Sequence, residues 1–143
     1  MNLILASQSP RRRELLGLTG LDFIVRVADI DETMDPKGTP FDEVARVSRR
    51  KAMAVAREKG DVVIAADTIV VCEGQILGKP RDEEDAFRIL SLLSGRHHEV
   101  MTGMTVLKDD VCITHTEVTK IHFRDLHPQE IRAYIASGRP ITL

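Results

Sequence analysis

The sequence contains very few aromatic side chains, only 3% of its 143 residues, and no tryptophan. Proteins that bind single-stranded nucleic acid stack the bases on aromatic rings, so this scarcity argues against such a surface. An excess of charge of one sign is also missing, because 20 Lys and Arg residues nearly balance 22 Asp and Glu residues. We therefore expect no binding to nucleic acid, and any anion-binding site must be local.

Cysteines and long apolar segments are scarce as well. Cys72 and Cys112 lie far apart in the sequence and do not have the spacing of a metal site. No secretory segment precedes them, so we expect reduced thiols in or near the core of a cytoplasmic protein. No apolar run approaches the roughly 20 residues that a membrane-spanning helix needs, and we expect no membrane partner.

Short strands alternate with amphipathic helices along the chain. Strands are predicted at residues 3–6, 23–27, 61–66 continuing through 69–72, 75–77, 100–107 and 111–123. Helices are predicted from residue 10 to 17, from 40 to about 59, from 83 to 94, and from 128 to 136. This alternation, with an antiparallel pair at 100–123, predicts a mixed α/β sheet.

Residues 11–13 are three arginines in the first turn of the first predicted helix. Ser9 is suited to cap this helix, and Pro10 to its first position. Cations at this end are disfavoured by about 0.3–1 kcal/mol each, because the backbone N–H groups already carry partial positive charge there. The arrangement is typical of a phosphate site, since a helix N-terminus and forked guanidinium groups both bind anions. A solvated basic turn is the alternative.

Acidic residues follow two of the predicted strands. Asp67 comes directly after the strongest strand, 61–66, and open α/β sheets carry their sites at strand ends. Its carboxylate is therefore a candidate for binding a metal or activating water. Asp31 or Glu32, in a loop after another strand, could share a divalent ion with it. The alternatives are an aspartate that caps a turn and acids of a solvated loop.

Two lysines are further candidates for binding phosphate. Lys51 lies at the edge of the apolar arc of the helix 40–59, and Lys79 lies in a constrained turn between a glycine and a proline. Together with the arginines they would supply enough positive charge for a triphosphate. The alternatives are a lysine that snorkels and an ordinary turn lysine. Arg46 and Arg50 are predicted to lie on the opposite, solvated side of the same helix.

Several motifs occur together and in order along the chain. They are LASQSPRRRELL at 5–16, DET at 31–33, RRKA at 49–52, AADTIV at 65–70, LGKPRD at 77–82 and LSGRHHEVMTG at 93–103. This ordered set resembles the Maf-like nucleotide pyrophosphatases. The resemblance implies an elongated mixed β-sheet flanked by helices with a central cleft, a divalent cation such as Mg²⁺ or Mn²⁺, and often a homodimer. It also implies hydrolysis of nucleoside triphosphates to the monophosphate and pyrophosphate.

The resemblance also implies roles for individual residues. Asp67 matches the proton acceptor and, with Glu32, the metal side of the site. Arg12 and Thr68 match residues associated with the choice of base. The residues that match phosphate contacts are Ser7, Arg11, Lys51 and Lys79. The SPRR and ADT motifs are similar to the branch that acts on dTTP and UTP, and the alternatives are a 7-methyl-GTP pyrophosphatase and a non-catalytic nucleotide sensor linked to cell division.

Residues 1–143 are interpreted as a single Maf-like domain that lacks the family's usual C-terminal segment. Members of the family continue past a proline that matches Pro140, whereas this sequence stops at Leu143. The resemblance implies that the missing stretch carries a DKAG-like segment, a glutamine linked to base choice, and a closing strand and helix. We therefore expect an interrupted domain.

Overall fold

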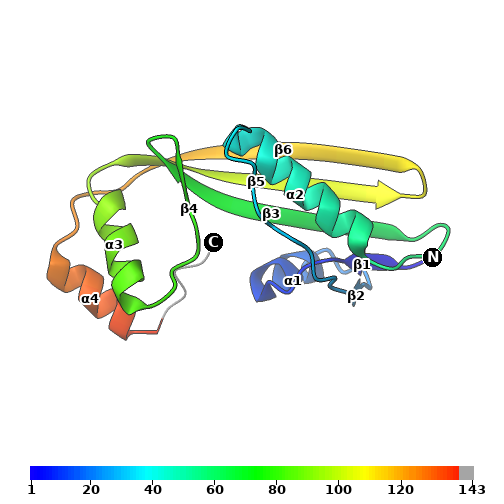
Figure 1. The fold of residues 1–143 in the computed structure, drawn as a ribbon. Helices are drawn as coiled ribbons and strands as arrows, with labels where there is room; N and C mark the ends of the chain where they lie inside the picture. Colours follow the sequence, from blue (N-terminus) through cyan, green and yellow to red (C-terminus); the bar gives the residue numbers. More distant parts are fainter. Residues whose placement is uncertain (139–143) are drawn as a thin grey trace. The chain divides into compact units, whose positions relative to one another are not determined.

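The computed structural model describes residues 1–138, which form a β-sheet with helices beside it (Figure 1). The strands are β1 (Leu3–Leu5), β2 (Ile24–Val25), β3 (Val62–Cys72), β4 (Gln75–Leu77), β5 (His97–Lys108) and β6 (Val111–His122). The helices are α1 (Pro10–Gly17), α2 (Pro40–Ala54), α3 (Glu83–Leu93) and α4 (Pro128–Ala136). The strand order is β2-β1-β3-β5-β6, and β4 also pairs with β3, so the predicted mixed α/β sheet is confirmed. Pro140 and Leu143, on which the expectation of an interrupted domain depends, lie outside the described residues.

Internal contacts divide the chain into two compact units. The first unit consists of Met1–Asp67 and Thr102–Glu117, and the second of Thr68–Met101 together with the residues from Val118 on. Strands β3, β5 and β6 contribute residues to both units. The interpretation of residues 1–143 as one Maf-like domain stays a prediction, as does the central cleft that the resemblance implies.

The first unit is built on a short parallel ladder. β1 pairs with β3 from Leu3 opposite Val62 to Leu5 opposite Ile64, and its other edge pairs with β2. A cluster of buried side chains fills the space beside this ladder: Ile4, Ala6, Ala52, Val55, Val63, Ala65 and Leu107. Within the apolar run of β3, Val63, Ala65 and Ala66 are buried, whereas Val62 and Ile64 are half-buried.

Helix α2 packs closely on β5 because small residues and hydroxyl groups lie in the contact. A Cβ atom added to Gly103 would lie only 2.4 Å from the carbonyl oxygen of Val44, so the helix backbone comes near the strand where there is no side chain. Ser48 Oγ lies 2.7 Å from Thr105 Oγ1, which lies 3.0 Å from Thr114 Oγ1. Because these hydroxyl groups satisfy one another, they hold α2 in one register on the sheet.

The second unit contains the α3–α4 pair (Figure 1). The Glu73-Gly74 turn joins β3 to β4, and both residues have positive φ, as two-residue hairpins require. Asp82 caps α3, because its Oδ1 accepts a hydrogen bond from the N–H of Asp85 at 2.7 Å. None of the helices within residues 1–138 is long and apolar enough to cross a membrane.

Several details differ from the expectations, among them the start of β5 at His97 instead of residue 100. Helix α2 ends at Ala54 instead of continuing to about residue 59, because Val55 has extended backbone and packs into the buried cluster. Packing of this kind overrides helix propensity. Strand β2 is shorter than predicted and consists of Ile24–Val25 alone. Cys72 is buried as expected, but Cys112 is exposed because it lies on the outermost strand, where most side chains face solvent.

Candidate active site

Asp67 lies within β3 and not at the end of a strand, so that part of the prediction is wrong. The strand continues to Cys72 because β3 goes on to pair with β4. The neighbouring strand β1 does end nearby, and its last pair with β3 joins Leu5 to Ile64. Beyond this pair the carbonyl oxygen of Ala66 accepts hydrogen bonds from side chains. Because β1 ends here, the carbonyl oxygen of Ala66, next to Asp67, is available to accept hydrogen bonds from side chains.

Lys51 contacts oxygen atoms of three different residues. Its Nζ lies 3.0 Å from Asp67 Oδ1, 2.8 Å from Glu32 Oε1 and 3.3 Å from the Ala66 carbonyl oxygen. The side chains of Lys51 and Asp67 are only 18% and 15% exposed, whereas that of Glu32 is 57% exposed. The predicted place of Lys51 at the edge of the buried arc is confirmed. Its ammonium group bridges the two acids that the sequence singled out.

Arg12 reaches the same carbonyl group from α1. Its Nη1 donates to the Ala66 oxygen at 3.0 Å and to the buried Ser7 Oγ at 3.4 Å. Ser9 caps the helix as predicted, since its Oγ accepts from the N–H of Arg12 at 3.3 Å. The cap thus positions the first turn of α1 so that one of its arginines points to β3.

The charges at this site influence one another. Burial lowers the pKa of the Arg12 guanidinium, and the carboxylates of Asp67 and Glu32 oppose that shift. An arginine side chain stays protonated at neutral pH even so. Two cations and two carboxylates therefore lie within one site, and partial burial makes their attraction stronger than it would be in bulk water.

Arg46 and Arg50 of α2 were not predicted to take part in the site. The structure turns both guanidinium groups toward the loop that precedes the helix. Arg46 Nη2 donates to the carbonyl oxygen of Thr33 at 2.9 Å, and Arg50 Nη1 donates to that of Asp31 at 2.8 Å. Their spacing of four residues on one helix face was a signal in the sequence, but their backbone partners were not visible there.

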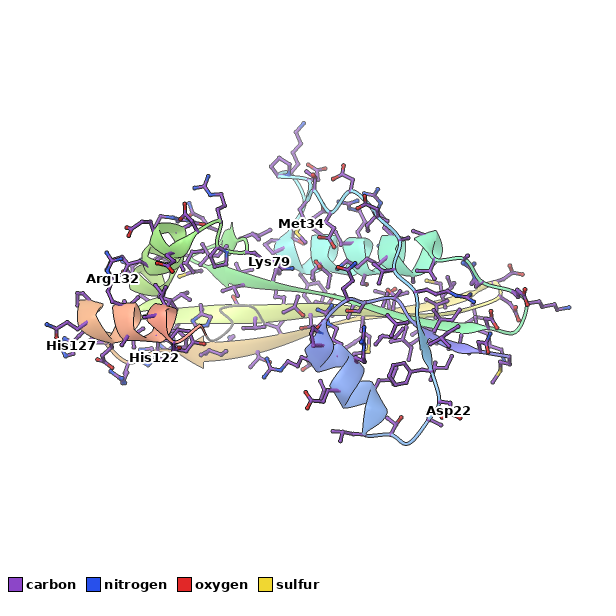
Figure 2. The ribbon with its side chains drawn as sticks, turned by 90° about the horizontal axis from the view of Figure 1, so that it is seen from below. Asp22, Met34, Lys79, His122, His127 and Arg132 are labelled. Atoms are coloured by element: carbon purple, nitrogen blue, oxygen red, sulfur yellow. The ribbon has the colours of Figure 1, made fainter. Side chains whose placement is uncertain are left out.

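The remaining predicted residues are placed as follows. Arg11 is exposed on α1, and Thr68 follows Asp67 in β3 with a half-buried side chain. Lys79 is exposed in the loop after β4 and belongs to the second unit (Figure 2). The residues that the structure brings together in the first unit are Ser7, Arg12, Glu32, Lys51 and Asp67. Substrate contacts of Arg11, Thr68 and Lys79 stay predictions.

A divalent cation is compatible with the two carboxylates. No group of three or more His, Cys, Asp or Glu side chains suited to a metal occurs within the part of the chain that is described. Glu32 and Asp67 nevertheless both face one ammonium group, that of Lys51. Mg²⁺ takes one or two carboxylates and completes its coordination with water and phosphate oxygens, so this pair fits Mg²⁺. Zinc, which takes three or four protein ligands, fits it poorly.

Comparison with solved structures defines the class of fold. The structure of the Staphylococcus aureus Ham1 protein aligns with a TM-score of 0.55 and 18% identity, covering 84% of this chain and 70% of that chain. A HAM1 protein from Coxiella burnetii aligns with a TM-score of 0.54 and 16% identity, covering 84% and 71%. At such identities the likeness establishes the fold alone. The chain has the mixed α/β fold of these Ham1 proteins.

Sequence comparison identifies the family within this class. Residues 2–142 match the profile of the family described as Maf-like protein. A dTTP/UTP pyrophosphatase from Geotalea uraniireducens is 51% identical over 142 residues, which cover 97% of this chain and 73% of the relative. A dTTP/UTP pyrophosphatase from Anaeromyxobacter dehalogenans is 50% identical over 143 residues, which cover 97% and 72%. The chain belongs to the Maf-like protein family, as its motifs predicted.

Proposed function

We propose that the protein hydrolyses nucleoside triphosphates to the monophosphate and pyrophosphate, with dTTP and UTP as its main substrates. Relatives of about 50% identity are named dTTP/UTP pyrophosphatases, and the SPRR and ADT motifs point to the same branch of the family. The observation that carries the proposal is the meeting of Lys51 and Arg12 on the carbonyl oxygen of Ala66, next to the Asp67 carboxylate. Cations beside an ionised acid suit the attack of water on a polyphosphate.

Asp67 acts on the attacking water in this mechanism. Its Oδ1 lies 3.0 Å from Lys51 Nζ, so the acid that accepts the proton lies directly beside a cation. The carboxylate orients a water molecule and takes its proton as the oxygen attacks the α-phosphorus. The bond between the α-phosphorus and the oxygen that bridges it to the β-phosphorus breaks, and pyrophosphate leaves with that oxygen.

The cations stabilise the charge that grows on the phosphate oxygens. Lys51 and Arg12 provide fixed donors in a partly buried site, where such donors are worth more than in water. Arg11 adds an exposed positive group for the outer phosphates, and a phosphate contact of Lys79 stays a prediction. Glu32 and Asp67 would hold Mg²⁺ or Mn²⁺, which would polarise phosphate oxygens. We extend the proposal to a homodimer that works in the cytoplasm.

A panel of triphosphates tests the function. The purified chain is incubated with dTTP, UTP, 7-methyl-GTP and the other common triphosphates plus Mg²⁺ or Mn²⁺, and pyrophosphate is measured. We expect pyrophosphate mainly from dTTP and UTP. Preference for 7-methyl-GTP would support the other branch of the family, and nucleotide binding without any product would support the sensor.

A matched pair of variants tests the mechanism in the same assay. Asp67→Asn should keep the fold and lose about 10²–10⁴-fold in turnover, which is the usual contribution of a general base. Asp110→Asn, in the exposed turn before β6, serves as the control and should retain full activity. Unchanged pyrophosphate release from Asp67→Asn would contradict the role of this carboxylate.

A further inference from the structure

The loop of residues 31–38, which carries Glu32, is held against α2 by three side chains of that helix. We call Glu43, Arg46 and Arg50 the clamp. Arg46 binds the carbonyl oxygen of Thr33, and Arg50 binds that of Asp31. Figure 2 shows Met34 of this loop beside the N-terminal end of α2. The loop therefore follows the helix surface instead of extending into solvent.

Glu43 is the member of the clamp that contacts both Arg46 and the loop backbone. Its side chain is only 9% exposed, and it receives the guanidinium of Arg46 through Nε and Nη2 at 2.9–3.2 Å. Its Oε1 also accepts the N–H of Asp35 at 2.5 Å. A Cβ atom on Gly38 would lie 2.9 Å from Glu43 Cγ, so the far end of the loop packs directly on this side chain. Charge-assisted hydrogen bonds of this kind are short and directional, which favours a single loop conformation.

The clamp fixes the backbone around Glu32 and leaves its side chain exposed to solvent. The pinned carbonyl groups belong to the residues immediately before and after Glu32. The Glu32 side chain is 57% exposed and meets Lys51 at 2.8 Å. A carboxylate on a fixed backbone can move from the ammonium group to a ligand without a rearrangement of the loop.

We infer that Arg46 and Arg50 are positioning residues, which place the Glu32 carboxylate beside Lys51 and Asp67 for the substrate and its divalent cation. This inference rests on the proposed function and adds two residues that the motif roles do not include. The arginines act through backbone carbonyl groups. Groups that orient a metal-binding carboxylate typically change metal affinity or activity by about 10–100-fold when they are removed.

Arg50→Ala is the sharpest test, because Arg50 is exposed and its removal leaves no charge buried without a partner. We expect the Mg²⁺ concentration for half-maximal dTTP hydrolysis to rise about 10-fold or more. Deuterium uptake by the amides of residues 31–38 should become faster, while the melting temperature stays close to that of the wild type. Arg50→Lys, which keeps a donor on a flexible stem, should restore part of both effects.

Arg49→Ala is the matched control, since Arg49 neighbours Arg50 on α2 and lies outside the clamp. It should change neither the Mg²⁺ requirement nor the uptake of deuterium by the loop. Equal behaviour of Arg50→Ala and Arg49→Ala in both measurements would overturn the inference.

Arg46 requires a balanced variant, because Arg46→Ala alone would leave the buried Glu43 carboxylate without its cation. The double variant Glu43→Gln with Arg46→Gln removes both charges and should affect exchange and Mg²⁺ requirement at least as strongly as Arg50→Ala. Loop exchange identical to the wild type in this double variant would also overturn the inference. If the wild type releases no pyrophosphate, the proposed function fails, and the exchange data still show whether the clamp holds the loop.

Discussion

The two compact units use similar charged pairs with different consequences. In the first unit, Lys51 and Asp67 are 18% and 15% exposed and lie 3.0 Å apart. In the second unit, Arg132 and Glu84 are 54% and 77% exposed at the same distance. Exposed pairs contribute little because water screens them, whereas partly buried charges interact strongly. Burial, and not the number of ion pairs, distinguishes the candidate site from an ordinary surface.

Asp85 and Asp67, two acids with little exposed surface, make the same contrast. Asp85 of the second unit has an 8% exposed side chain that accepts from the N–H of Arg81 and from the guanidinium of Arg88. These hydrogen bonds, first that of Arg81, lower the pKa of Asp85 and secure the start of α3. Asp67 of β3 instead meets Lys51 of α2, which is 16 residues away in the sequence. The partner of Asp67 comes from a distant element of the fold, which brings charged groups together in the candidate site. The partners of Asp85 are three or four residues away and only secure the start of a helix.

Within this comparison of charged pairs, the largest effect is expected from removing the partly buried cation Lys51. Lys51→Met should lower kcat/KM for dTTP by about 10²–10³-fold, which is the usual loss when one donor to a developing phosphate or oxyanion charge is deleted. Steady-state release of pyrophosphate measures it. A loss of less than about threefold would remove the functional distinction between the two units.

The next effect concerns the close packing of α2 in the first unit. Gly103→Ala should destabilise the protein by about 1–3 kcal/mol, because the added Cβ would overlap the Val44 carbonyl oxygen. The comparison is Gly78→Ala in the second unit, where the added atom would meet nothing within 4 Å. Urea unfolding of both variants measures the difference, and equal midpoints would show that the helix relaxes without cost.

A pH-dependent effect should appear in the second unit. The hydrogen bond from Arg124, followed by that from the N–H of His127, lowers the pKa of Glu130 from its ordinary value of 4.5 to about 2. Because the pKa is lower in the folded state, this contact stabilises the fold above pH 4.5 and is lost as the pH falls toward 2. NMR titration of the Glu130 carboxyl carbon should report the low pKa in the wild type and a value near the ordinary one in Arg124→Gln. The same pKa in both proteins would rule out the pair as its cause.

The smallest effect is expected at the exposed pair between α3 and α4. The guanidinium carbon of Arg132 lies 4.0 Å from the centre of the Phe87 ring, and its Nη1 lies 3.0 Å from Glu84 Oε1. Arg132→Ala should cost about 0.2–1 kcal/mol of stability and leave kcat unchanged. Thermal unfolding with a parallel activity assay measures both. A loss of stability comparable to that of Gly103→Ala would mean that this contact stabilises the fold more than its solvent exposure predicts.

Much of the fold could be predicted because its signals are local. Ser9, Thr39 and Asp82 each cap a helix, and their oxygen atoms accept from backbone N–H groups three residues later. The Glu73-Gly74 turn is equally local. The end of α2 was predicted wrongly because Val55 responds to a cluster assembled from several strands. Asp67 was placed at a strand end for a similar reason, since only the pairing of β3 with β1 and β4 shows where each strand stops.

In the candidate site, too, some residues could be predicted from the sequence and others could not. Residue types and motif order identified Glu32, Lys51 and Asp67 as candidates, but left Arg46 and Arg50 on the solvent side of the helix. Their partners are backbone carbonyl groups of a loop that folds back on α2, and a side-chain pattern carries no information about such groups.

The amino-acid sequence by itself determined the family, through the order of its motifs along the chain. It also determined the starts of the helices and the turns, because caps and turns depend on contacts within a few residues. Only the tertiary structure decided that one ammonium group bridges Glu32 and Asp67, and that two arginines hold the loop beside them. Those contacts exist because Gly103 and the hydroxyl groups of Ser48 and Thr105 hold α2 in one register on β5. The energy of that packing is shared among residues far apart in the chain, so no single segment encodes it.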